Sequence, residues 1–115
     1  MTFKIKHLHI KTPHPQETAK WWVENLGAKI LPEDAPNAIK LELDSIVVNV
    51  GKFSEQQTRL QRYGLEHMAV STDDFKNVVN KLKANGARFL EETSGGAVFL
   101  ETPDGVQLEV FAIDK

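Results

Sequence analysis

The sequence predicts an α+β protein built from two β-α-β-β-β modules, which form an open, cup-shaped mixed sheet with the helices outside. Two observations lead to this prediction. A set of motifs recurs about half a chain apart, and each half shows the same order of strand-like and helix-like hydrophobic patterns. Because each module's sheet has one apolar face to cover, the two modules must pack together or dimerise.

The repeat is visible before any secondary structure is assigned. Three pairs of segments carry it, with only small gaps between them: residues 7–12 with 67–72, 26–31 with 85–90, and 41–46 with 100–106. The first pair aligns His7 with His67, and extending the last pair aligns Asn49 with Glu109. We therefore expect one supersecondary unit to occur twice.

The helix of the first module is expected over about residues 16–26. Pro15 suits its opening turn, and Gly27 can take the left-handed conformation that ends a helix. Trp21 and Trp22 are neighbours on this helix, so they cannot both face the core. We expect at least one of them to pack there.

The helix of the second module is expected after residues 72–74, where Thr-Asp-Asp offers an N-cap and negative charge at the positive end of the helix dipole. Gly86 is expected to stop it. The apolar stripe that predicts this helix has the spacing i, i+3, i+4, i+7 and consists of Phe75, Val78, Val79 and Leu82.

Each module is expected to continue into a pair of strands joined by a tight turn. The predicted pairs are residues 38–43 with 46–50, and 97–102 with 106–111. The whole chain, 1–115, is thus predicted to be a single domain, with module one at about 1–52, a polar connection at 53–64 and module two at about 65–115.

Composition excludes several classes of function. With 115 residues the chain suits one core, and a formal net charge of -2 with mixed signs offers no patch for nucleic acid. Cysteine is absent, so any metal must be held by His, Asp, Glu or amide oxygens. The N-terminus has no long apolar segment of a secretory signal, and no stretch is long enough to span a membrane. We expect an unprocessed cytoplasmic protein.

A candidate metal site follows from strand alternation. His7 and His9 fall on one face of the first strand. His67 falls on the equivalent face of the repeated strand, and Glu109 on the last strand. If a pseudo-twofold axis relates the modules, His7, His67 and Glu109 converge inside the cup. Two imidazoles and one carboxylate would leave open positions on a divalent ion for water or substrate oxygens.

The chain resembles a known family, the vicinal-oxygen-chelate superfamily of glyoxalases, bleomycin-resistance proteins and dioxygenases. The resemblance covers essentially the whole chain. Three stretches carry it: His7 followed by a helix that ends at residues 25–27, the strand 66–70, and residues 102–109. The last of these is similar to the C-terminal signature of the family.

The resemblance implies a ligand set. The superfamily places metal ligands on the first and last strands of each module, and His7, His67 and Glu109 occupy three of those four places. Relatives usually carry Glu, Gln or His at the fourth place, where this chain has Asn49. Because an Asn is shorter and neutral, Asn49 is expected to be at most a weak fourth ligand. This departure counts against lactoylglutathione lyase activity.

The leading functional hypothesis is a small metal-dependent enzyme of the glyoxalase type, a lyase or isomerase that chelates vicinal oxygens of a small-molecule substrate. The ion would be Ni, Zn, Mn or Fe, and Glu109 or His9 would act as the base. His9 has Ala69 as its repeat partner and is alternatively a fourth ligand. Two other hypotheses stay open: an Fe(II) extradiol-type dioxygenase, which shares the ligand set, and a metal-free binding protein of the bleomycin-resistance type.

The remaining polar residues are given structural roles. His14 is expected in a solvated loop, Glu42 and Glu101 on the solvent side of their strands, and Asp104 in a turn. The resemblance and the open sheet edges also predict a homodimer. Nothing in the sequence identifies the substrate.

Overall fold

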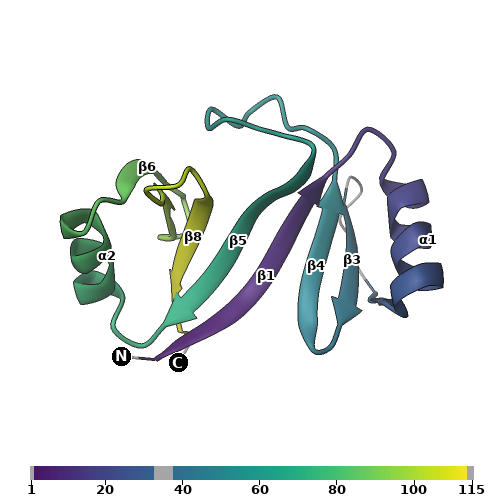
Figure 1. Cartoon of the computed structure of the whole chain (residues 1–115), viewed down its shortest axis with the longest axis horizontal. Helices are drawn as coiled ribbons and strands as arrows, with labels where there is room; N and C mark the ends of the chain where they lie inside the picture. The colour runs from purple at the N-terminus through teal and green to yellow at the C-terminus, as the bar shows by residue number, and fades with distance from the viewer. Residues whose placement is uncertain (1, 33–37, 114–115) are drawn as a thin grey trace. The chain divides into compact units, whose positions relative to one another are not determined.

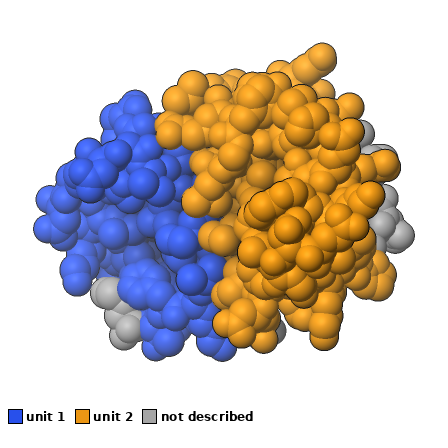
Figure 2. Space-filling model, turned by 45° about the vertical axis from the view of Figure 1, so that its right-hand side comes forward, with its two compact units in different colours: residues 1–6, 67–115 blue, residues 7–66 orange. Residues whose placement is uncertain are grey.

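The computed structural model describes residues 2–32 and 38–113. The chain divides into two compact units, which Figure 2 shows in blue and orange. Unit 1 consists of Met1–Lys6 with His67–Lys115, and unit 2 of His7–Glu66. The predicted domain and module limits stay predictions, and their outermost residues, 1 and 114–115, lie outside the described residues.

Unit 2 contains the first module. Its strands form a sheet in the order β2-β3-β4-β1, in which β1 and β4 are parallel and the other neighbours are antiparallel. The elements are β1 (Phe3–Lys11, of which residues 7–11 belong to this unit), α1 (Pro15–Leu26), β2 (Lys29–Ile30), β3 (Ala38–Leu43) and β4 (Ile46–Gly51) (Figure 1).

Unit 1 repeats the same plan. Its sheet has the order β5-β8-β7-β6, again with one parallel pair, β5 with β8. The elements are β5 (Gly64–Thr72, of which residues 67–72 belong here), α2 (Phe75–Ala84), β6 (Arg88–Glu92), β7 (Val98–Glu101) and β8 (Gln107–Ala112). Both halves are β-α-β-β-β, so the predicted α+β, glyoxalase-like fold class is confirmed.

The helix ends mostly follow the sequence signals. Pro15 stands in the first turn of α1, and Gly27 ends this helix with φ of 76°. The N-cap of α2 is Asp74, within the predicted residues 72–74, but its side chain makes no hydrogen bond to the helix backbone. Its carboxylate instead accepts from the side chain of Asn77 at 3.1 Å.

Each unit has a hydrophobic core of its own between its helix and its sheet. In unit 2 the core is Ile10, Ala19, Ala28, Leu41, Val48 and Val50. In unit 1 it is Val70, Val78, Val79, Val98, Leu100 and Val110. Trp22 packs against the unit 2 core, whereas Trp21 is 56% exposed, as the adjacency of the two tryptophans requires. Neither described helix has the length and apolar character of a membrane span.

Candidate functional site

The sheet in each unit has a second face, opposite the helix, which we call the polar face. In parallel and antiparallel ladders, paired residues point to the same side, and alternation separates them from the core positions. The polar face of unit 2 therefore carries His7, His9, Asn49 and Lys40. The polar face of unit 1 carries His67, Ala69, Glu109 and Phe99.

The strand registers match the sequence repeat. His9 pairs with Asn49, and Ala69 pairs with Glu109, so both positions are offset by 60 residues (9 to 69 and 49 to 109). Asn49 thus occupies the place in unit 2 that Glu109 occupies in unit 1.

Unit 1 brings two of the predicted ligands together. His67 Nε2 lies 3.2 Å from Glu109 Oε1, and the side chains are only 5% and 11% exposed. The ring of Phe99 meets the His67 imidazole edge to face, with centroids 5.1 Å apart and planes at 86°. A buried carboxylate needs a partner. The pair is therefore held in place by burial, by the direct contact of the two side chains and by an aromatic neighbour.

Unit 2 brings together His7 and His9. Ring nitrogens of His7 and His9 lie within 4.8 Å of each other, and both side chains are half-buried on β1. Beside them on β4, Asn49 Oδ1 is buried and has no hydrogen-bond partner among residues 2–32 and 38–113. A buried amide oxygen without a donor costs free energy, so this oxygen is available to a ligand.

The other polar residues lie outside these pairs. His14 is exposed at the start of α1, where its Nδ1 lies 3.2 Å from Thr12 Oγ1. Glu101 accepts from Arg88 at 2.9 Å on the surface of unit 1. Asp104 belongs to the turn before β8, in agreement with the structural role predicted from the sequence.

Sequence reasoning missed a buried charged cluster in unit 2. Glu66, whose side chain is fully buried, lies 3.4 Å from Arg59 and 3.9 Å from Lys11. Gln57 donates to Glu66 at 2.8 Å, and Gln61 accepts from Lys11 at 3.1 Å. The cluster fastens the connection before β5 to β1. Burial lowers the pKa of Lys11, while the Glu66 carboxylate acts in the opposite direction.

Comparison with protein families agrees with the fold. Residues 4–110 match the model of the Glyoxalase/Bleomycin resistance protein/Dioxygenase superfamily. The chain belongs to this superfamily. Because the match covers nearly all of the chain, the family resemblance inferred from the motifs is confirmed. Among curated proteins, no sequence matches the chain significantly.

Several solved structures of the superfamily fold are similar to the chain. A hypothetical protein from Bacillus halodurans C-125 shares 21% identity at a TM-score of 0.76, over 100% of this chain and 97% of the other. Methylmalonyl-CoA epimerase from Mycobacterium tuberculosis shares 14% identity at a TM-score of 0.67, over 96% and 88%. The Mn(II)-bound glyoxalase from Novosphingobium aromaticivorans shares 20% identity at a TM-score of 0.63, over 95% and 37%. At these identities the likeness is one of fold.

Proposed function

We propose that this superfamily member is a small metal-dependent enzyme of the glyoxalase type, a lyase or isomerase acting on vicinal oxygens of a small molecule. His7, His67 and Glu109 would hold the divalent ion. The observation that carries the proposal is the buried His67–Glu109 pair, with a 3.2 Å separation, on the polar face of unit 1. The repeat relates His67 to His7 on the polar face of unit 2.

The residues fit a divalent ion. Ligand atoms about 2.1 Å from one tetrahedral ion are about 3.4 Å apart, close to the separation of His67 Nε2 and Glu109 Oε1. Nitrogen and carboxylate donors suit the first-row ions Mn, Fe, Ni and Zn. The buried, unpartnered Oδ1 of Asn49 is a further oxygen donor on the polar face of unit 2. A neutral amide there keeps the site at one carboxylate.

The chemistry proposed for the chain's own residues is proton transfer. A bound ion would act as a Lewis acid that polarises the two vicinal oxygens of the substrate. Glu109 or His9 would then take the proton from the carbon beside the polarised carbonyl and return it to the neighbouring carbon or to the opposite face. His67 would orient Glu109 through their contact.

The first experiment measures divalent-metal affinity by calorimetry and metal content under anaerobic conditions, with Ni, Zn, Mn and Fe(II). We expect one ion per chain for the wild type. The variants His7→Ala, His67→Ala and Glu109→Ala should each weaken binding at least tenfold, because a three-ligand site loses a ligand. Glu101→Ala and His14→Ala are matched controls, since their side chains are engaged elsewhere.

Absence of binding by the wild type would contradict the proposal, as would equal losses in the control variants. The reaction class is tested separately by following deuterium uptake from solvent into a panel of α-hydroxycarbonyl compounds. Oxygen consumption with catechols, activated by Fe(II) alone, would instead identify an extradiol-type dioxygenase. The Mn(II)-bound state of one similar glyoxalase supports including manganese in the screen.

A second candidate function is a metal-free binding protein, and one observation favours it. His67 and Glu109 lie close enough to satisfy each other by a direct hydrogen bond, so their burial does not require a metal ion. Such a protein would bind an antibiotic or metabolite on the polar faces without turnover. It is distinguished from the enzyme by two results. A small molecule binds saturably, and adding a chelator does not weaken this binding.

We further propose that the protein acts on a small molecule in the cytoplasm and forms a homodimer. Exposed apolar side chains, among them Phe3, Ile5 and Leu60, support self-association. Sedimentation velocity across a hundredfold range of concentration tests this proposal. A single species with the mass of one chain throughout would contradict it.

A further inference from the structure

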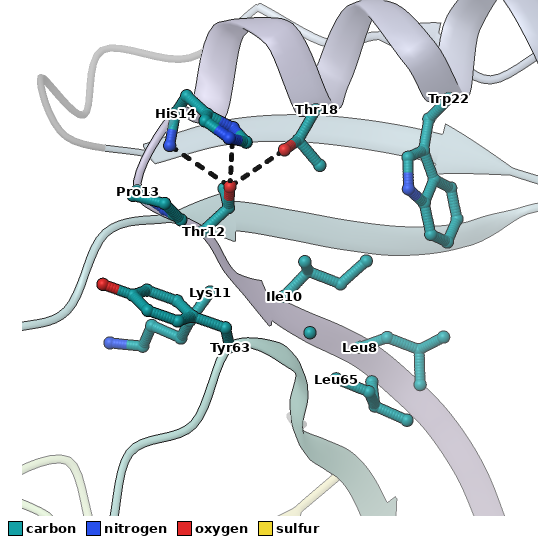
Figure 3. A pocket seen from close by; sticks show the side chains of 11 residues that line it. Leu8, Ile10, Lys11, Thr12, Pro13, His14, Thr18, Trp22, Tyr63 and Leu65 are labelled. Carbon is teal, nitrogen blue, oxygen red and sulfur yellow. Dashed lines mark hydrogen bonds between the residues drawn. The ribbon is translucent and has the colours of Figure 1, made fainter.

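A pocket of about 570 Å³ lies in unit 2, on the helix side of β1 (Figure 3). Leu8 and Ile10 of β1 and Trp22 of α1 form its apolar wall, and Leu65 also borders it. Because side chains alternate along a strand, Leu8 and Ile10 point to the opposite side from His7 and His9. The apolar wall of the pocket therefore lies on the opposite face of β1 from His7 and His9.

The polar end of the pocket is organised by one hydroxyl group. Thr12 Oγ1 accepts from the Thr18 hydroxyl at 3.0 Å and from the backbone N–H of His14 at 3.2 Å. Thr12 Oγ1 also lies 3.2 Å from His14 Nδ1. In the tautomer in which Nδ1 accepts from Thr12, the His14 ring has its N–H at Nε2, and this group is a hydrogen-bond donor for a ligand.

The charge in the pocket wall is already compensated. Lys11 also lines the pocket. Its ammonium group donates to Gln57 at 3.4 Å and to Gln61 at 3.1 Å, and it lies 3.9 Å from Glu66. An anionic ligand would have to compete with the Glu66 carboxylate for this cation. The lining thus favours a neutral ligand over an anion.

We propose that this pocket is a second, metal-independent binding site for a neutral aromatic small molecule with a hydrogen-bond-accepting oxygen at one end. The volume lies within the range of about 300 to 1,000 Å³ found for small-molecule sites. The ring would lie between Trp22 of α1 and Tyr63, which border the pocket from different segments (Figure 3). The oxygen would accept from His14 Nε2–H. The proposal goes beyond the proposed function and does not depend on it.

The test uses acetophenone as a neutral aryl ketone, ethylbenzene as its analogue without the oxygen, and benzoate as the anion. Nitrogen-proton NMR spectra of the full chain follow the Trp22 indole N–H and the Gly64 amide. We expect saturable shifts at both with acetophenone, and at least tenfold weaker binding of benzoate. His14→Ala should weaken acetophenone binding about fivefold and leave ethylbenzene binding unchanged, because only the ketone accepts from the imidazole.

Two further variants keep the test interpretable. Leu65→Trp adds bulk at an exposed rim position, so it should abolish binding of both neutral probes without disturbing the core. It should leave metal affinity unchanged, whereas His7→Ala should leave acetophenone binding unchanged, which separates this proposal from that of the metal site. The proposal is overturned by shifts confined to the polar faces or by no saturable binding. It is equally overturned if the Trp22 resonance moves with protein concentration alone, which would indicate a second copy in the pocket.

Discussion

The two polar faces have the same strand order and register but different chemistry. In unit 1, Glu109 is buried against His67 and lies beside Phe99 on the neighbouring strand. In unit 2 the corresponding register positions hold Asn49 and Lys40. Unit 1 thus has an acid beside an imidazole and an aromatic ring. Unit 2 has a neutral amide beside a cation. The repeat preserves backbone geometry while side chains at matching positions diverge.

The two units also differ in where their buried carboxylates lie. Unit 1 keeps its buried acid on the polar face, next to an imidazole. Unit 2 places its buried acid, Glu66, between Lys11 and Arg59, where it fastens the connection to β1. Glu109 is suited to binding a ligand, whereas Glu66 holds the connection against β1. The following substitutions test that division, beginning with the largest expected effect.

Replacing Glu66 with Gln should destabilise the protein by about 3 to 5 kcal/mol, because Lys11 and Arg59 lose their shared buried carboxylate. Urea unfolding measures the change. Glu101→Gln is the matched control in unit 1, since its pair with Arg88 is 28% and 68% exposed and should contribute less than about 1 kcal/mol. Equal effects of the two substitutions would refute the assignment of a holding role to Glu66.

Asn49→Asp gives unit 2 a carboxylate at the place of Glu109. Without metal, this variant should be less stable by about 1 to 3 kcal/mol, because a buried oxygen without a donor would become charged. With Mn or Ni added, the affinity should rise at least tenfold over the wild type. The two effects have opposite signs, so a general loss of structure cannot imitate them. If metal affinity falls, Asn49 does not face the proposed ion.

Phe99→Leu tests the aromatic support of His67. We expect a loss of stability of about 1 to 2 kcal/mol from the smaller buried side chain and the lost edge-to-face contact. Metal affinity should fall several-fold because the imidazole is less firmly oriented. Lys40→Leu, at the corresponding register position of unit 2, should cost less stability than Phe99→Leu, because Lys40 is only half-buried. Calorimetry on both variants checks the pair.

The smallest effect concerns Asp73, an exposed carboxylate of unit 1. Its Oδ1 accepts from the Thr2 backbone N–H at 2.9 Å, and this hydrogen bond lowers the pKa of Asp73 below 3.8. A depressed folded-state pKa contributes stability that is present above the unfolded pKa and is lost as the pH falls through the folded value. Asp73→Asn should therefore slightly lower the melting temperature at pH 7 and leave it unchanged near pH 2. The opposite pattern would contradict the assignment.

Much of the fold follows from local signals in the sequence. Pro15 and Gly27 bound α1 because their backbone preferences suit a first turn and a left-handed end. Alternation put His7 and His9 on one face of β1, and the repeat aligned Asn49 with Glu109 as the registers do. These features depend on neighbours along the chain or on a spacing that is the same in both halves.

The features that escaped prediction depend on side chains distant in sequence. Lys11 and Glu66 are both charged residues in strands, and strand patterns place such residues in solvent. Only the folded connection shows that they share a buried cluster. The N-cap of α2 lacks its side-chain hydrogen bond for a related reason, since the Asp74 carboxylate accepts from Asn77 instead. Residue spacing alone does not show which of several possible partners a side chain will bind.

Strand β1 serves two surfaces at once, with His7 and His9 in front and Leu8 and Ile10 behind. A shift of this strand by one residue would turn its side chains to the opposite faces of the sheet. Deleting one residue within residues 7–11 would turn the following histidine or lysine toward the helix and its apolar neighbours toward the opposite face. The length of this short segment is therefore constrained more tightly than any single side chain within it.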